Sequence, residues 1–420
     1  MKMAAQAFTS RQPCIAGSRS TKKLAVFVLA AACVTAGCAT ATSRSVAPEQ
    51  VVAHQAPTEF SEDQLLDVWI ETFKPGEVSK SETEEGLSME IREAEARYMP
   101  TELRSTMERT GYWGAVRTVP QGVEGAEVMV AGKIEKSDGE TLSLVITATD
   151  ARGVQWFSSR YAYKVDFEQY RKRKPGTGEL FAPLYNTIAN DLARYRAKLT
   201  AKQVTAIRRT AQLRFAADLA PSAFSDHIEK GSNGGYELVR LPARDDPMYG
   251  RVMQIREREL VLVDTLSGRS DAFYREMRHP YQEWRKARAA EAEALRQVKR
   301  EAFKQKALGA LAIGAAIGLE AAGINIGSTA SSVLIVGGAY SIRRGIDLSS
   351  ETAIHRDALQ ELGLSFSSDA RPLVVELDGE THELTGNAEA QYARWRDLLR
   401  RIHLSETGLA DAAEVNPDRR

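Results

Sequence analysis

An apolar run in the C-terminal third of the chain constrains the fold more than any other feature. Residues 307–342 are thirty-six consecutive positions with a single charge, Glu320. Small residues recur every four positions within this run, at Ala310, Gly314, Gly318 and Ala322. That spacing puts small side chains along one helix face and lets a second helix approach closely. A turn-forming stretch at residues 323–328 divides the run, so we predict a Gly/Ala-rich apolar helical hairpin over residues 307–345.

The possible functions differ in what surrounds this hairpin. Each arm has about thirteen to fifteen residues, fewer than the ~20 that a helix needs to cross a bilayer. An apolar surface of this size normally marks an interaction site. We therefore expect the hairpin to be covered by the rest of the protein or by a sister subunit. The alternative is that it enters a bilayer.

The N-terminus carries the pattern of an exported protein. Residues 1–23 hold five basic residues and no acidic one, and fourteen uncharged residues then lead to Cys38. A basic region, a short apolar run and small residues predict a secretory signal peptide. The sequence Val34-Thr35-Ala36-Gly37-Cys38 resembles the lipobox of bacterial lipoproteins. A plain signal peptide with an incidental cysteine is the alternative.

The lipobox resemblance implies both processing and location. It implies that residues 1–37 are removed and that Cys38 becomes a lipidated first residue carrying acyl chains such as palmitate. Ala39, by resemblance to lipoproteins of Gram-negative bacteria, favours the outer membrane, with the folded part on its periplasmic face. Residues 38–60 are small, polar and proline-containing, which predicts a tether.

Removal of residues 1–37 would also change the cysteine content and the net charge of the chain. Cys14 and Cys33 leave with the signal peptide, so the mature chain has no free thiol and no internal disulfide. The net charge falls from zero to about −5, which gives no global reason to bind nucleic acid. We expect the membrane to be contacted through the lipid anchor.

Residues 61–166 predict a small α+β domain. A strand-like run near residue 66 is followed by helical spacing over residues 81–110. Four further strand-like runs lie at residues 113–119, 128–134, 142–146 and 154–165. This order predicts a strand, a helix and an antiparallel meander, with the helix on one face of the sheet.

This segment is similar to a domain of known envelope proteins. A helix ending at Gly111-Tyr112, a Val-x-Gly-x-Ile strand at residues 130–134 and an Asp-x-x-Gly turn at residues 150–153 carry the similarity. It resembles the N-terminal domain of TolB, the curli-secretion lipoprotein and the lipoprotein activators of penicillin-binding proteins. The resemblance covers about 100 of 420 residues. It implies a docking and assembly element without an active site.

The remaining chain predicts mostly helices. Residues 167–306 show long helical spacing and end in a charged helix. Residues 346–405 predict an α-β-β-α unit, because Asp378-Gly379 lies between two alternating segments, as in a hairpin turn. Residues 406–420 predict a disordered polar tail.

No catalytic constellation emerges from the sequence. The six histidines are not at metal-binding spacing from one another, and no zinc, P-loop, Rossmann or nucleophile-elbow motif stands in its required context. The charged residues between Arg251 and Glu259 are interpreted as a solvated helix face. We therefore predict no enzyme activity, no metal and no cofactor. Aromatic candidates for an interface are Trp113, Trp156 and Tyr161, with core packing as the alternative.

These observations lead to one expected function and two alternatives. We expect a non-enzymatic, lipid-anchored periplasmic protein that is an accessory or assembly component of a cell-envelope complex, with an envelope protein or a second copy as partner. The first alternative is a membrane-inserting or pore-forming lipoprotein that uses the hairpin at residues 307–342. The second is an envelope hydrolase with an unrecognised site.

Overall fold

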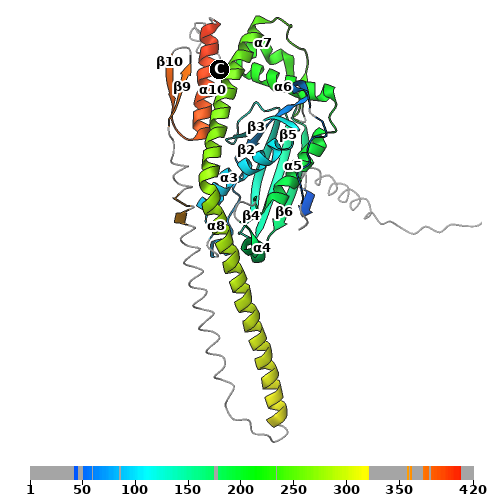
Figure 1. The fold of residues 1–420 in the computed structure, drawn as a ribbon. Helices are drawn as coiled ribbons and strands as arrows, with labels where there is room; N and C mark the ends of the chain where they lie inside the picture. The colour runs from blue at the N-terminus through cyan, green and yellow to red at the C-terminus, as the bar shows by residue number, and fades with distance from the viewer. Residues whose placement is uncertain are drawn as a thin grey trace, which may run out of the picture. The chain divides into compact units, whose positions relative to one another are not determined.

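The computed structural model describes residues 42–45, 51–58, 60–84, 87–174, 178–232, 234–320, 357–358, 360–361, 372–377 and 380–407. Within residues 305–320 it describes the helical backbone only. These residues form a mixture of helices and strands (Figure 1), which confirms the expected combination of α and β structure. Cys38, the signal peptide and the second arm of the expected hairpin lie outside the described residues.

A mixed sheet forms the centre of the fold. Its strands are β2 (Leu66–Glu71), β3 (Trp113–Val119), β4 (Val128–Ser137), β5 (Thr141–Asp150) and β6 (Gln155–Lys164). Their order is β6-β5-β4-β2-β3, and the short strand β1 (Thr42–Ser45) pairs in parallel with β6 at one edge. The strands β4, β5 and β6 form an antiparallel meander, as predicted.

The strand β3 departs from the prediction. We expected residues 113–119 to be the first strand of the meander, but β3 pairs in parallel with β2, which is also parallel to β4. The helix α3 (Met89–Glu108) connects β2 to β3. A crossover through a helix returns the chain in the same direction, so the two strands become parallel neighbours.

The helix α3 passes through Pro100 without ending there. Proline has no amide hydrogen, which leaves the carbonyl of residue 96 without its usual helical partner. The amide of Phe73 donates to that carbonyl at 2.9 Å. The freed acceptor therefore ties α3 to the chain that follows β2, and Gly111 ends the connection at φ 71°, as predicted.

The helices after the sheet share its core. The short helix α4 (Phe167–Lys172) is followed by α5 (Ala182–Arg196) and α6 (Ala201–Leu219). Apolar side chains of α5 and α6, among them Leu184, Ile188 and Ile207, belong to the same buried cluster as Val68 and Leu144 of the sheet. The boundary that we expected at residue 166 therefore does not separate two cores.

The expected tether is partly held on the folded body. The amide of Ala56 donates to the carbonyl of Thr110 at 2.8 Å. The side chain of Asn190, on α5, accepts from the amide of His54 and donates to the carbonyl of Val52. Residues 51–56 thus lie against α5 and the turn that follows α3.

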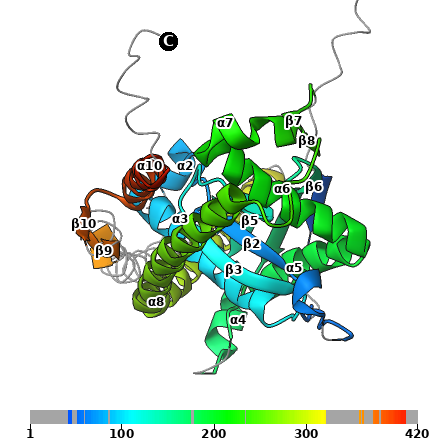
Figure 2. The same cartoon turned by 90° about the horizontal axis from the view of Figure 1, so that it is seen from above.

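The longest element is α8 (Pro247–Glu320), a single helix of 74 residues (Figures 1 and 2). It follows the small elements α7 (Pro221–Phe224), β7 (Ile228–Lys230) and β8 (Tyr236–Leu238). It packs beside α3 and against β3, the edge strand of the sheet. The hydroxyl of Ser267 on α8 accepts from the amide of Thr118 on β3 at 3.1 Å. The helix therefore covers a sheet edge whose amides would otherwise be open to pairing with another chain.

The C-terminal elements agree with the predicted hairpin and helix. β9 (Leu373–Leu377) pairs antiparallel with β10 (Glu380–Leu384), and α10 (Ala388–Glu406) follows. Asn387 caps α10 by accepting from the amide of Ala390. The buried Trp395 and Leu399 pack α10 into a second apolar cluster together with the first turns of α8.

A glycine tests how closely α8 approaches the sheet. Gly139, in the β4–β5 turn, has φ 89°, and a Cβ there would lie 2.9 Å from the carbonyl oxygen of Arg285 on α8. We expect Gly139→Ala to lower the free energy of unfolding by about 2 kcal/mol or more, because backbone strain and a clash add together. The matched control is Gly122→Ala, at φ 76° in open space, which should cost about 1 kcal/mol. Urea unfolding measures both, and equal losses would contradict the close approach.

Candidate functional site

The apolar run identified in the sequence begins inside α8. Ala310, Gly314 and Gly318 lie on this helix, and Ala322 lies outside the described residues. The first arm of the expected hairpin is thus the end of a helix that starts sixty residues earlier, at Pro247. What the apolar end can do depends on how the rest of α8 is held.

An ion pair buried on both sides holds the middle of α8. The guanidinium of Arg285 lies 2.7 and 2.8 Å from the two carboxylate oxygens of Glu179, and the two side chains are 2% and 4% exposed. The same guanidinium packs over the rings of Tyr281, at 4.3 Å, and Phe181. Although burial alone would raise the pKa of Glu179, the charge of Arg285 lowers it. Glu179 is therefore held as a carboxylate.

A second buried group joins α8 to α3. The carboxylate of Glu95 accepts from the hydroxyl of Tyr281 at 2.7 Å and from that of Ser137 at 2.5 Å. Arg92 lies 3.3 Å away on the same helix. Glu95 is completely buried, and burial raises its pKa. One carboxylate thus connects α3, α8 and the end of β4.

Further side-chain contacts join α8 to α3. Tyr274 on α8 donates to Glu102 on α3, and the rings of Tyr98 and Tyr274 stack at 4.7 Å. Arg104 on α3 donates to Asp271 on α8 at 2.7 Å. The side of α8 that faces α3 is therefore held by several specific side-chain contacts.

The N-terminal part of α8 is held by α10. Glu259 is fully buried and accepts from the hydroxyl of Tyr392 at 2.6 Å and from Arg396 at 2.7 Å. Arg256 donates to the carbonyl of Gly125 at 2.9 Å. We expected residues 251–259 to form a solvated charged face, and this is wrong for Glu259, which pairs with residues more than 130 positions away.

The last described hydrogen bond between α8 and the body lies at Arg296. Its guanidinium donates to both oxygens of Glu140 at 2.6 Å. From Glu259 to Arg296 the anchored part of α8 is about 55 Å long at ~1.5 Å per residue, and about 36 Å of helix follows to Glu320. In that following part Phe303 is 73% exposed. The geometry is that of a firmly held helix whose end carries the apolar run.

The aromatic residues proposed as an interface lie in the core. Trp113 and Trp156 are each 6% exposed and Tyr161 is fully buried. Trp156 stacks between Trp113, at 6.2 Å, and Tyr195, at 4.7 Å, and the hydroxyl of Tyr161 donates to Asp191. These side chains join the sheet to α5 and do not offer an exposed surface.

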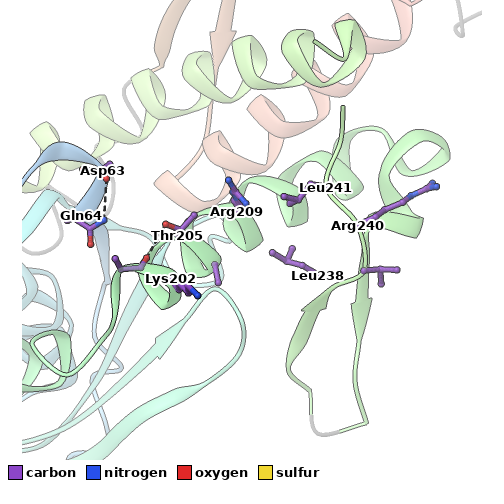
Figure 3. Close-up of a pocket in the computed structure, with 11 residues that line it drawn as sticks. Asp63, Gln64, Lys202, Thr205, Arg209, Leu238, Arg240 and Leu241 are labelled. Atoms are coloured by element: carbon purple, nitrogen blue, oxygen red, sulfur yellow. Dashed lines mark hydrogen bonds between the residues drawn. The ribbon is translucent and has the colours of Figure 1, made fainter. Parts of the chain in front are cut away.

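A separate open groove lies between α6 and the segment after β8 (Figure 3). It has a volume of about 720 Å³. Lys202 and Arg209 line it from α6, and Leu238 and Leu241 point toward α6 from the opposite wall, whereas Arg240 points away. Its one lining carboxylate, Asp63, accepts from Ser61 and Gln64. The groove thus combines positive charge with exposed apolar side chains and does not assemble a pair of carboxylates for acid–base chemistry.

Two further findings concern the described part of the chain. It contains no group of three or more histidine, cysteine, aspartate or glutamate side chains placed to hold a metal ion. Among its helices, none has an apolar stretch of the length and hydropathy that crossing a membrane requires. Comparison of the chain with protein-family models, with curated proteins and with solved structures finds no match.

The buried pair at Arg285 predicts a large and non-additive effect on stability. Arg285→Met should lower the free energy of unfolding by about 3–5 kcal/mol, because it leaves the carboxylate of Glu179 buried without a partner. The double variant Arg285→Met with Glu179→Met should lose much less than the sum of the single variants. Arg171→Met, which breaks an exposed pair with Glu168, is the control and should change stability by less than about 1 kcal/mol. Additive losses in the urea-unfolding cycle would show that the pair does not act as a unit.

Because Glu102 is buried, we expect a substitution at this position to change the stability of the protein in a pH-dependent way. Burial raises its pKa, so at neutral pH the folded state carries an ionised carboxylate in an unfavourable place, and this cost disappears once the carboxyl is protonated. Glu102→Gln keeps an acceptor for Tyr274 and removes the charge. We expect this variant to be more stable than the unmodified protein at neutral pH, with the difference vanishing as the pH falls below the ordinary range for glutamate. A stability difference that is constant with pH would contradict this reasoning.

Proposed function

We propose that this chain is a non-enzymatic lipoprotein of the bacterial outer membrane that acts as an accessory or assembly component of an envelope complex. Cys38 carries the lipid anchor, and the folded part lies on the periplasmic face. In this proposal residues 61–166, which share their core with α5, α6 and α8, are the docking element that resembles TolB-N. The end of α8 is the first arm of the hairpin at residues 307–345, and the C-terminal α-β-β-α unit braces the start of α8.

The observation that carries the proposal is the way in which α8 is held. Glu95, Glu179 and Glu259 are buried carboxylates, and each accepts hydrogen bonds from, or pairs with, a group on another element. These contacts hold one helix rather than surrounding a cavity. A protein that holds a helix firmly while its apolar end extends past the last anchoring contact is suited to connecting other components.

The groove beside α6 supports a protein partner. Val239 and Leu241 are 59% and 47% exposed on its rim, close to Lys202 and Arg209. Exposed apolar residues next to polar ones are typical of surfaces that bind other proteins. A hydrolase remains the weaker alternative, because its chemistry needs converging acid–base groups, which the lining of this groove lacks.

The anchor and the partner can be tested in the same cells. Cys38→Ser should abolish incorporation of radiolabelled palmitate, and labelled palmitate on that variant would contradict the lipobox interpretation. A photo-crosslinking residue at Leu241 in the acylated protein should capture a reproducible envelope protein. The matched control places the crosslinker at Arg171, an exposed position on α4. Capture that is equal at both positions, or absent at Leu241, would contradict a partner surface at the groove.

A further inference from the structure

The groove beside α6 presents two positive charges that have no partner within the described part of the chain. Lys202 and Arg209 line the groove and are exposed, and neither side chain forms a salt bridge or a hydrogen bond with another described residue. Arg208, which lies next to Arg209 in the sequence, pairs instead with Glu127 at 3.0 Å. The two charges that line the groove are therefore available to a ligand.

The wall that carries these charges is otherwise made of small side chains. Four of the lining residues on α6 recur at i, i+3, i+4 and i+7 and so share one face of the helix, namely Lys202, Thr205, Ala206 and Arg209. The two charged residues are about 10.5 Å apart along the helix axis, at ~1.5 Å per residue. The short side chains of Thr205 and Ala206 lie between them and leave room for a bound backbone.

The opposite wall of the groove is apolar. Leu238 and Leu241 point toward α6 (Figure 3), and Leu241 is 47% exposed. Arg240 points away from α6 and lies 3.9 Å from Asp226. A ligand in the groove would thus contact positive charge on one side and apolar side chains on the other.

The volume of the groove favours an extended chain over a helix. A strand occupies about 4.8 Å by 10 Å in cross-section, so the groove volume of about 720 Å³ accommodates about 15 Å of strand, or about four to five residues. A helix with its side chains is ~10–12 Å wide, and the same volume would hold only about one and a half turns of it. In a strand, successive side chains point to opposite faces, and residues two positions apart are ~6.7 Å apart on the same face.

We propose that this groove binds an extended segment of the partner protein in which acidic and apolar side chains alternate. The carboxylates of the segment face Lys202 and Arg209, and the apolar side chains on its other face contact Leu238 and Leu241. The long, flexible side chains of lysine and arginine bridge the difference between the ~6.7 Å spacing of the carboxylates and the ~10.5 Å spacing of the charges on α6. A recessed site with different chemistry on its two walls fits a single chain better than it fits the flat surface of a bilayer.

Defined peptides test this chemistry on the full chain, kept in a non-ionic detergent. The probe is a short fluorescein-labelled peptide in which glutamate and valine alternate, and its binding is measured by fluorescence anisotropy. One control peptide has the same composition with all glutamates before all valines, and a second alternates lysine and valine. We expect the alternating acidic peptide to bind roughly fivefold more tightly than the first control, and the basic peptide not to bind.

Variants of the two walls separate the contribution of charge from that of apolar contact. Lys202→Gln with Arg209→Gln should weaken binding of the alternating acidic peptide about fivefold at low salt, and high salt should remove most of this difference. Leu241→Ser should weaken binding about threefold or more at low and at high salt. Arg171→Gln with Lys172→Gln, which removes two exposed charges from α4, is the matched control and should leave binding unchanged.

Three results would overturn the proposal. Equal binding of all three peptides would show that the groove does not recognise the alternating pattern. If no peptide binds, but vesicles that contain phosphatidylglycerol bind in a way that requires Lys202 and Arg209, the occupant is a lipid surface. If no peptide binds, and the chain sediments as a dimer that Leu241→Ser dissociates, the occupant is a second copy of this chain.

The inference rests on the proposed function, which supplies the partner, but the two can fail separately. Crosslinking at Leu241 that captures an envelope protein, together with peptides that bind equally, would contradict only the alternating acidic and apolar pattern. Selective binding of the alternating acidic peptide, together with no captured protein in cells, would contradict the envelope partner and support the chemistry assigned to the groove.

Discussion

The burial of Arg285 against Glu179 is the interaction on which the arrangement of α8 depends. Removing a guanidinium and a carboxylate from water costs several kcal/mol for each group, and only close, well-oriented contact offsets this. A slide of α8 by one residue, ~1.5 Å, would separate the pair and leave two buried charges unpaired. The ion pair therefore determines the register of the helix more than it adds to stability.

The sheet depends on α8 as much as α8 depends on the sheet. The strand β3 is at an edge because α3 returns the chain in parallel beside β2. The amide of Thr118 donates to Ser267, and Arg117 pairs with Asp264. Side chains of α8 therefore contact the edge of β3 at which a further strand could otherwise pair. A domain cut at residue 166 would expose this edge together with the apolar face of α3, where the ring of Tyr98 stacks on that of Tyr274 and contacts that of Tyr281 at a tilt. The meander, α3 and α8 thus form one structural unit.

Local sequence patterns predicted well where the helices and strands lie. They predicted poorly which strands pair and which side chains meet. The turn at residues 150–153, the strands β4 to β6 and the hairpin of β9 and β10 were predictable, because alternation and turn chemistry act over a few residues. The parallel pairing of β3 depends on the path of α3 and was missed. Glu259 and Arg256 have the spacing of a solvated pair, and no local signal distinguishes them from the exposed pair of Arg171 with Glu168. Their burial follows from Tyr392 and Arg396, far along the chain.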